Sequence, residues 1–342
     1  MKKYCIAAFL MFLFLSGYAQ AFNKQNLQEL KHKEDTLKNY ADKLINGYDA
    51  VTRFKSDSLF TKLFVRALKT PLSFNYPFDS LLTISKLYAP DNSFRIFTWQ
   101  LVVNENLTRQ HGAIQMNTTD GSLKLYPLID KSDVTQQLAD TTANNKGWIG
   151  AVYYKIIETR GLNKNYYTLL GYDENNIRSN RKIIEVLSFN NEEPVFGGAL
   201  FSFDEDSTAK PATSRHILEY KKTAGTRLVY DPELQMIIAE HLESETNEHL
   251  KKWTYIPDGD YEGFKWKNGK WVHVEKVFNQ VTAEGAEPMP KPVKDAMGNT
   301  IEDRLKDNVQ EGTSPVEDMP VEKKPAPKPK PKHKGTKPPS KQ

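Results

Sequence analysis

The rhythm of apolar residues between Phe94 and Phe278 constrains this chain more than any other feature of its sequence. Short alternating or apolar runs are separated there by Gly, Asn and Asp, a pattern typical of strands joined by turns. We find no repeat of fixed period, so the sequence does not indicate a solenoid or a propeller. The expected strands cover residues 95–103, 112–116, 122–128, 148–158, 165–171, 182–189, 194–203, 215–220, 226–230, 261–267 and 270–278.

One further segment, residues 231–242, fits two structures. Asp231-Pro232-Glu233 is compatible with the capped start of a helix, and equally with the turn of a hairpin that leads into an Ile-rich strand. We favour the hairpin.

Two segments near the N-terminus show helical periodicity instead. Apolar residues recur at helical spacing through residues 23–48, and Gly47 ends the pattern. A second amphipathic helix is expected over residues 58–68, where Pro71 lies just beyond the end. Both helices have one apolar face, so each is expected to pack against another element.

These elements predict an α+β fold. A third, shorter helix is expected between Asp79 and Ala89. The N-terminal helical segment, residues 22–72, is expected to pack on a largely antiparallel, β-rich domain over residues 73–282. Residues 283–342 offer too little apolar surface to offset the entropy of ordering them, so we expect a disordered tail rich in Pro and Lys.

The start of the chain has the three parts of a signal peptide. Two lysines precede an unbroken apolar stretch over residues 5–15, and Ala19-Gln20-Ala21 follows as a small-residue cleavage site. The stretch is shorter than the roughly 20 residues that cross a bilayer. We therefore expect cleavage of residues 1–21, or else cleavage after Ala19, and a mature protein in the periplasm or outside the cell.

Few chemical motifs can be recognised. The single cysteine, Cys5, lies at the start of the apolar stretch, which argues against a lipoprotein anchor and leaves the expected mature chain without a thiol. No Gly-x-Ser-x-Gly elbow, phosphate loop or dinucleotide fingerprint is present. His241 and His249 are eight residues apart, a spacing that fits no familiar zinc pair. The sequence therefore indicates neither a cofactor nor a metal.

Charge is distributed unevenly along the chain. The whole chain has 47 Lys and Arg against 43 Asp and Glu, but residues 323–342 hold eight lysines and no acid. Residues 22–322 carry 37 basic and 43 acidic side chains, a formal charge of −6. No nucleic-acid partner is expected from an acidic domain. The cationic tail is expected either to hold the protein to anionic envelope polymers or lipid headgroups, or to act only as a solubilising segment.

Three runs resemble segments of exported proteins from Bacteroidetes-type bacteria: PDNSFRIFTW at residues 90–99, YYTLLG at 166–171 and DGDYEGF at 258–264. The resemblance implies export. It implies no activity, because no function is established for such proteins.

Asn268-Gly269 between two alternating segments is the strongest hairpin signal in the chain, because both residues of such a turn need positive φ. A two-residue loop at this position fixes the register of the two strands. The expected pairs on one face are Trp266 with Trp271, Phe264 with His273 and Glu262 with Glu275, and Lys267 faces Lys270 next to the turn.

The aromatic face of this hairpin has two interpretations. Trp266, Trp271 and Phe264 are the candidates for a platform on which a sugar ring stacks. The alternative is a cross-strand aromatic pair that stabilises the hairpin, worth about 0.5 to 1.5 kcal/mol beyond the buried area. We favour the structural pair.

Acidic residues in the same hairpin are the candidates for a ligand or cation site. Alternating oxygen ligands before a glycine imitate the first half of a calcium loop, but its twelfth position, where a bidentate Glu belongs, is Gly269. We therefore favour a solvated acidic turn. The candidate residues are Asp258, Asp260, Glu262, His273 and Glu275.

Together these observations favour an exported cell-envelope protein with a non-enzymatic binding or structural role. The alternative is a hydrolase that acts on envelope polymers or glycans, because no local pattern reveals paired carboxylates that are distant in the sequence. A pocket with converging carboxylates, or with a Ser and a His in contact, would favour the hydrolase.

Overall fold

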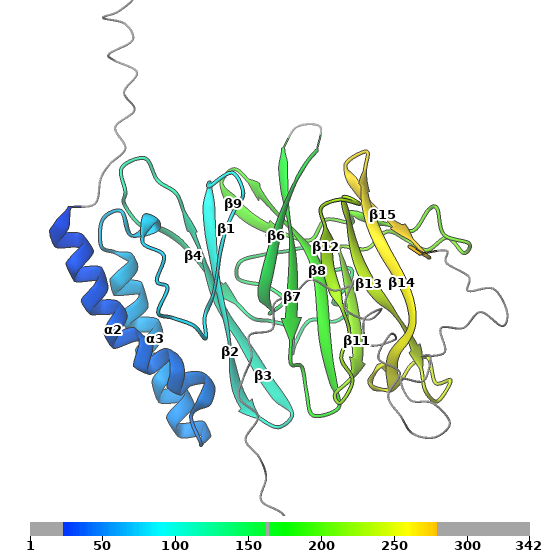
Figure 1. The fold of residues 1–342 in the computed structure, drawn as a ribbon, viewed down its shortest axis with the longest axis horizontal. Helices are drawn as coiled ribbons and strands as arrows, with labels where there is room; N and C mark the ends of the chain where they lie inside the picture. Colours follow the sequence, from blue (N-terminus) through cyan, green and yellow to red (C-terminus); the bar gives the residue numbers. More distant parts are fainter. Residues whose placement is uncertain (1–22, 162–163, 279–342) are drawn as a thin grey trace, which may run out of the picture. The chain divides into compact units, whose positions relative to one another are not determined.

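A computed structural model describes residues 23–161 and 164–278 of the chain. The predicted signal peptide (1–21), the predicted tail (283–342) and the lysine-rich segment 323–342 lie outside the described residues. Neither of the two helices in the described part has the length and apolar character needed to cross a bilayer. Within this part, the fold is α+β, with two N-terminal helices and three largely antiparallel sheets, as the sequence predicts (Figure 1).

The two helices form a hairpin. α2 (Lys24–Asn46) confirms the first predicted helix and ends before the predicted glycine stop. α3 (Ala50–Leu68) begins well before the predicted start at Ser58. The side chain of Asp49 accepts the backbone N–H of Thr52 at 2.6 Å and so caps the helix there. The helix thus starts at its cap and not at its first apolar cluster.

The third predicted helix is wrong. Ser85–Tyr88 form strand β1, which pairs antiparallel with β2 (Phe94–Asn104). Phe78 has φ of 56°, a left-handed conformation that an α-helix does not contain. Phe78, Leu81 and Ile84 are buried from an irregular segment of turns that follows α3. The flanking Pro77-Phe78-Asp79 and Ala89-Pro90 had suggested the start and the end of a helix.

The strands form three sheets, and all neighbours are antiparallel except β10 and β15. The first sheet has the order β1-β2-β3-β4 and includes β3 (Leu107–Met116) and β4 (Lys124–Ile129).

The second sheet has the order β5-β9-β8-β7-β6, and β11 also pairs with β8. Its strands are β5 (Ala143–Asn144), β6 (Val152–Arg160), β7 (Asn165–Asp173), β8 (Ser179–Asn190), β9 (Glu193–Phe196) and β11 (Arg215–Lys221). The third has the order β10-β15-β14-β13-β12, with β10 (Phe201–Ser202), β12 (Leu228–Asp231), β13 (Met236–Ser244), β14 (Tyr255–Lys267) and β15 (Lys270–Val274). Two short 3-10 turns, η1 (Ser73–Asn75) and η2 (Lys252–Thr254), complete the described elements.

The structure decides between the two alternatives for residues 231–242 and corrects the strand predicted over residues 194–203. The hairpin prediction for residues 231–242 is confirmed, because β12 ends at Asp231 and β13 begins at Met236 in antiparallel register. The single strand predicted over residues 194–203 is instead divided into β9 and β10. Gly197 and Gly198 lie between them with φ of 95° and 128°, and there the chain passes from the second sheet to the third.

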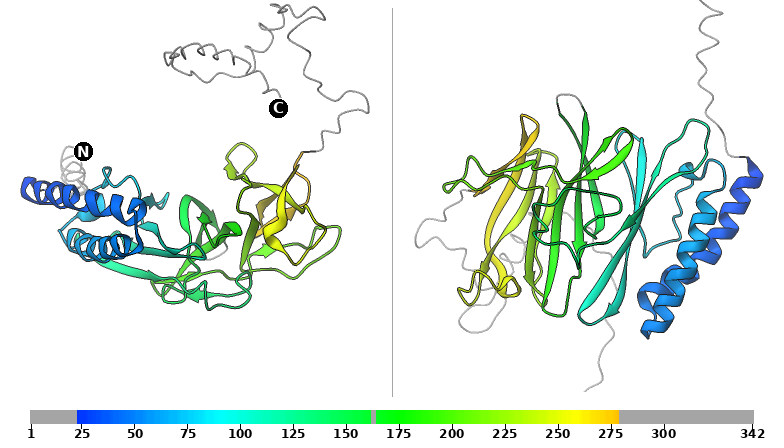
Figure 2. Two further views of the ribbon diagram at one scale, coloured as in Figure 1. Left: turned by 90° about the horizontal axis from the view of Figure 1, so that it is seen from below. Right: turned by 180° about the vertical axis from the view of Figure 1, so that it is seen from behind.

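The helices and sheets are stacked as successive layers (Figures 1 and 2). Strands of the middle layers are apolar on both faces, which explains their nearly continuous apolar sequence. On β8, Ile183 and Leu187 belong to the core shared with the first sheet, whereas Ile184 and Val186 belong to the core shared with the third. Alternation along each strand thus fills two cores at once.

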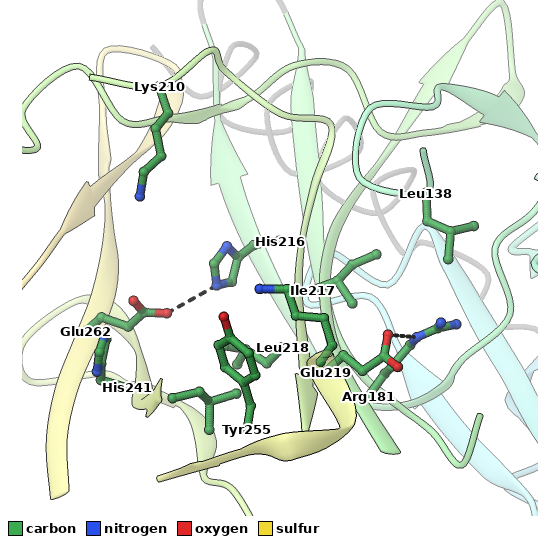
Figure 3. A pocket seen from close by; sticks show the side chains of 12 residues that line it. Leu138, Arg181, Lys210, His216, Ile217, Leu218, Glu219, His241, Tyr255 and Glu262 are labelled. Atoms are coloured by element: carbon green, nitrogen blue, oxygen red, sulfur yellow. Dashed lines mark hydrogen bonds and ion pairs between the residues drawn. The ribbon is translucent and has the colours of Figure 1, made fainter. Parts of the chain in front are cut away.

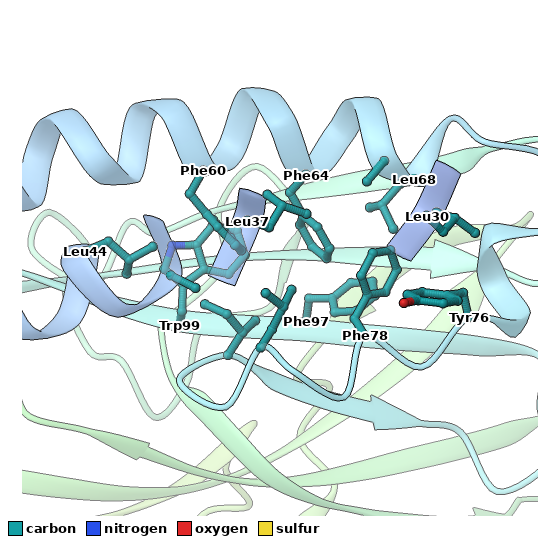
Figure 4. Close-up of a cluster of buried hydrophobic side chains, with 14 residues drawn as sticks. Leu30, Leu37, Leu44, Phe60, Phe64, Leu68, Tyr76, Phe78, Phe97 and Trp99 are labelled. Atoms are coloured by element: carbon teal, nitrogen blue, oxygen red, sulfur yellow. The ribbon is translucent and has the colours of Figure 1, made fainter. Parts of the chain in front are cut away.

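The core between the helices and the first sheet is rich in aromatic rings (Figure 4). Phe64 of α3 contacts Phe97 of β2 edge to face, with ring centroids 4.8 Å apart. Phe60 contacts Trp99 in the same way at 5.2 Å. These contacts hold the predicted helical segment against the sheet.

Candidate functional site

The β14–β15 hairpin has the turn and register that the sequence predicts. Asn268 and Gly269 have φ of 51° and 81°, as a tight turn with two left-handed residues requires. The pairs Lys267 with Lys270, Trp266 with Trp271 and Phe264 with His273 lie directly opposite each other. The predicted pair Glu262 with Glu275 does not form, because β15 ends at Val274, four residues earlier than expected.

The two tryptophans contact each other edge to face. Their ring centroids are 5.3 Å apart and their planes are inclined by 69°. Trp271 is 1% exposed and donates from Nε1 to Thr168 Oγ1 at 2.8 Å. Trp266 donates to the carbonyl of Arg160 at 3.1 Å. A stacking platform needs coplanar exposed rings, so this geometry supports the structural interpretation. Phe264 is fully buried beside them.

Three of the five acidic-site candidates have separate partners. Asp258 contacts His241 Nδ1 at 2.6 Å, and Asp260 contacts Lys276 at 3.2 Å. Glu275 accepts the Oγ–H and the backbone N–H of Ser207. These carboxylates do not converge with the other two candidates. Within residues 23–161 and 164–278, no group of three or more His, Cys, Asp or Glu side chains could hold a metal ion.

The remaining two candidates, Glu262 and His273, lie together with two residues that sequence reasoning missed. His273 Nδ1 is 2.8 Å from Asp206 Oδ1, and His273 Nε2 is 3.4 Å from Glu262 Oε2. The other oxygen of Glu262, Oε1, is 3.2 Å from Nε2 of His216 on β11 (Figure 3). We call Asp206, His273, Glu262 and His216 the His-Glu cluster.

The cluster lies largely out of water, and its charges stabilise each other. Burial alone would raise the pKa of Glu262, but contacts with His216 and His273 hold it well below its usual range. Burial alone would lower the pKa of His273, but contacts with Glu262 and Asp206 raise it. Glu262 is therefore an anion and His273 favours the cationic form in the cluster.

A pocket of about 480 Å³ opens beside the cluster, between β11 and the strands β13 and β14. His216 and Glu262 form part of its wall, together with Lys210, Tyr255 and Lys252. Figure 3 shows the side chains of Lys210 and Tyr255 directed toward the space beside His216. The pocket is thus lined by apolar side chains of the strands and by several charged side-chain groups.

Most charged groups of this pocket already have partners of opposite charge. Arg181 contacts Glu219 at 3.0 Å. Lys210 and Lys252 differ, because neither forms an ion-pair contact in the described part of the chain, and each ammonium lies over an aromatic ring. Lys210 also interacts electrostatically with Glu275, whose pKa is lowered mainly by its hydrogen bonds with Ser207. Lys252 is 4.1 Å from the ring centroid of Tyr255. These two lysines leave positive charge at the pocket that an anionic group can neutralise.

The pocket meets neither condition that would favour a hydrolase. Glu219 and Glu262 both line it, but each is held by a different cationic partner. In the described residues, the histidine ring nitrogens that make side-chain contacts face carboxylates, and none contacts a Ser or Thr hydroxyl.

No local sequence pattern would have found this site. His216 is 46 residues from Glu262, and Asp206 is 67 residues from His273. The only usable signal was the predicted register, which places His273 and Glu262 on one face of the hairpin.

Comparison of the chain with models of protein families, with characterised proteins and with solved structures finds no match. The function has to be argued from the site itself.

Proposed function

We propose that this protein is exported and has a non-enzymatic binding role in the cell envelope, and that the pocket beside the His-Glu cluster holds an anionic group of its ligand. The expected signal peptide, residues 1–21, supports export. The observation that carries the binding role is the pair of lysines, Lys210 and Lys252, that line the pocket without an ion-pair contact to a carboxylate in the described chain.

The ionisation of the pocket favours binding over glycoside hydrolysis. Hydrolysis by two carboxyl groups needs one of them protonated near neutral pH, so its pKa has to be raised. The pKa of Glu262 is instead held low by its two histidine partners, although burial opposes this. Glu219 is occupied by Arg181. Neither carboxylate is suited to donate a proton to a leaving group.

The lysine-rich segment 323–342 fits the same role as a second point of attachment. Its eight lysines would attract anionic envelope polymers or lipid headgroups, whereas the acidic domain alone would be repelled. This attraction would weaken with salt, because exposed charges are screened over about 8 Å at physiological ionic strength.

Binding to paired oligosaccharides tests the proposal. The probes are acidic oligosaccharides that carry carboxylate or phosphate groups, and neutral ones with the same backbone. We expect the full chain to bind the acidic oligosaccharides. The effect of the pocket is measured in a chain that lacks 323–342. There, the double variant Lys210→Ala, Lys252→Ala should bind them at least tenfold more weakly than the same shortened chain without the substitutions. The matched control is Lys270→Ala, an exposed lysine at the hairpin turn.

Two results would contradict the proposal. One is equal binding by the double variant and the parent. The other is release of shortened oligosaccharides during incubation, which would identify a hydrolase.

A further inference from the structure

We propose that the free edge of β11 pairs with an extended acidic peptide, which adds a strand to the second sheet inside the pocket of Lys210 and Lys252. The inference rests on the proposed function, because it takes this pocket to be the binding site, and it names the class of ligand. The lysines supply charge for the acidic side chains of such a peptide, and the strand edge supplies hydrogen bonds for its main chain.

The direction of the main-chain groups of β11 follows from its register with β8. The backbone N–H of Lys222, the residue after β11, donates to the carbonyl of Arg178 at 2.8 Å. These two residues lie opposite each other in the continuation of the β11–β8 register. Hydrogen-bonded and non-hydrogen-bonded pairs alternate along an antiparallel ladder. The even-numbered residues of β11 therefore bond to β8, and the odd-numbered residues point their N–H and C=O groups away from it.

The start of this outer edge is paired with other parts of the chain. Thr213, which precedes the strand, exchanges backbone hydrogen bonds of 2.9 and 3.1 Å with Phe201. The backbone N–H of Arg215 donates to the carbonyl of Ala139 at 2.9 Å. Both odd-numbered residues thus use their outward groups in the way that the alternation requires.

Ile217 and Glu219 are the next two outward residues, and there the edge is open. β11 pairs with β8 alone, and in residues 23–161 and 164–278 the outward main-chain groups of Ile217 and Glu219 make no hydrogen bond. Both residues line the pocket together with His216 and Leu218, so the pocket follows the strand along its edge. A row of unpaired N–H and C=O groups is a template for a further strand.

The open part of the edge has the length of a short peptide segment. A strand rises about 3.3 Å per residue, so Ile217 and Glu219 are about 7 Å apart along β11. An antiparallel segment of about five residues that pairs with both of them makes about four main-chain hydrogen bonds. The pocket volume of about 480 Å³ lies in the range of sites for small ligands.

The charge beside this edge favours acidic side chains in the peptide. Lys210 and Lys252 line the pocket and form no ion-pair contact in the described chain. The ammonium of Lys210 lies 5.8 Å from the ring centroid of Phe203, and this ring is 6.3 Å from that of His216. Lys210 therefore lies on the face of β11 that carries His216 and Leu218.

These positions specify a pattern in the ligand. Peptide residues opposite Ile217 and Glu219 pair through their main chain, and the residues between them direct their side chains to the face of His216 and Lys210. We therefore expect acidic residues at every second position, with β-branched residues between them. An acidic oligosaccharide supplies the anionic groups, but it has no amide main chain with which to complete the ladder.

Two isomeric peptides test the proposal. The probe is a capped heptapeptide in which Val and Glu alternate, with Val at both ends. One isomer carries N-methyl groups on its two central Val residues, and the other carries them on two Glu residues. Both have the charge of the unmethylated peptide, so the lysine-rich segment 323–342 attracts all three equally.

We expect the full chain to bind the unmethylated peptide and the Glu-methylated isomer with similar affinity, measured by fluorescence anisotropy. The Val-methylated isomer should bind about tenfold more weakly, because it has lost the donors that face β11 and leaves carbonyls of the edge unpaired. A site that recognised charge alone would not distinguish the two isomers.

A proline on the protein side removes the same kind of hydrogen bond. Ile217→Pro deletes the outward N–H and spares the ladder with β8, because proline is tolerated in an edge strand where its nitrogen faces away from the sheet. It should weaken binding of the unmethylated peptide about tenfold. Ile217→Val is the matched control, because it keeps the N–H and should bind as the parent does. Circular dichroism shows whether each variant is folded, and the isomers decide the question in the parent chain.

The proposal is overturned if the full chain does not bind the unmethylated peptide, if the two isomers bind equally, or if folded Ile217→Pro binds as tightly as Ile217→Val. Lost peptide binding in the double variant Lys210→Ala, Lys252→Ala, together with equal binding of the isomers by the parent, would uphold the anionic pocket and overturn the strand pairing. A dimer of the parent that Ile217→Pro abolishes would assign the edge to a second copy of the chain, and would overturn the peptide as its partner.

Discussion

Two regions of the molecule bury an arginine completely, and they neutralise it in different ways. Arg95 of β2 faces the segment beneath the helices, and Arg215 of β11 lies in the second sheet; both are 0% exposed. Arg95 donates to two backbone carbonyls, to Gln115 Oε1 and to the hydroxyl of Tyr88. Its guanidinium also lies 4.6 Å from the ring centroid of Phe97. No carboxylate contacts it among the described residues.

Arg215 has a counter-ion instead. Its Nε donates to Glu185 Oε2 at 2.8 Å, and the two residues lie directly opposite each other on β11 and β8. Glu185 is also fully buried and accepts the hydroxyl of Tyr153. The carbonyls of Leu138 and Thr141 accept from Arg215 Nη1.

The two regions differ in the groups that are left unpaired when the arginine is replaced. Burial lowers the pKa of Arg95 to about 10, and Tyr88 only partly opposes this, because dipoles and rings do not replace a full counter-charge. Removal of Arg95 leaves neutral acceptors without a donor. Removal of Arg215 leaves a buried anion, which costs more in a medium of low dielectric constant.

The largest expected effect is therefore that of Arg215→Met. Breaking a buried ion pair from one side destabilises a protein by about 3 to 5 kcal/mol. Urea unfolding followed by tryptophan fluorescence measures the change. The variant Arg215→Met, Glu185→Leu should regain most of this loss, because it removes both charges. A double variant no more stable than the single one would show that the charges themselves are not the cause.

Arg95→Met should lower the free energy of unfolding somewhat less, by about 2 to 4 kcal/mol. It leaves several neutral acceptors unpaired, at about 1 to 3 kcal/mol each, but it also removes a buried charge, which partly offsets this loss. No single carboxylate substitution should rescue it. The control is Arg109→Met, whose ion pair with Asp133 is exposed and should contribute at most about 1 kcal/mol. Equal losses for Arg95→Met and Arg109→Met would show that the buried hydrogen bonds of Arg95 contribute no more than an exposed ion pair.

The parts of the fold that follow local rules were predictable. Asn268-Gly269 fixed the turn and the register of the hairpin, because the need for positive φ is a property of two adjacent residues. The first helix followed from its apolar period. The segment between Asp79 and Ala89 was misassigned, because Pro and Asp residues at its ends are compatible with the boundaries of a helix and equally with turns. Only the pairing of β1 with β2, a contact outside the segment, distinguishes the two structures.

The site was predictable only in part. Glu262 and His273 were identified because they share one hairpin face. His216 comes from β11, which approaches the hairpin through the packing of the second sheet on the third, and Asp206 follows β10, which pairs with β15 of the hairpin. A contact between residues dozens of positions apart has no spacing that a single sequence can reveal.

Trp271 is a buried side chain without charge and serves as a reference for the two arginines. Trp271 is as buried as Arg215 but carries no charge, so Trp271→Ala should cost about 2 to 4 kcal/mol through lost packing and the lost hydrogen bond to Thr168. The loss should appear without any ligand. Trp266→Ala is the control, because this ring is only partly buried and should cost clearly less. An unchanged stability of Trp271→Ala, together with lost glycan binding, would restore the sugar-platform interpretation.

The smallest expected effect comes from the hairpin turn, where neither charge nor burial contributes. A Cβ added to Gly269 would meet no atom within 4 Å, yet the residue has φ of 81°. Gly269→Ala should therefore cost about 1 to 2 kcal/mol, which is the conformational penalty of a left-handed residue alone. Gly225→Ala is the matched control, because its Cβ also meets nothing and its φ is not positive. This second substitution should be neutral, or stabilising by about 0.4 to 1 kcal/mol, since alanine restricts the unfolded chain. If both variants lose the same stability in urea unfolding, the turn conformation is not what distinguishes them, and the register of the hairpin must be held by the buried pair Trp271 and Phe264 instead.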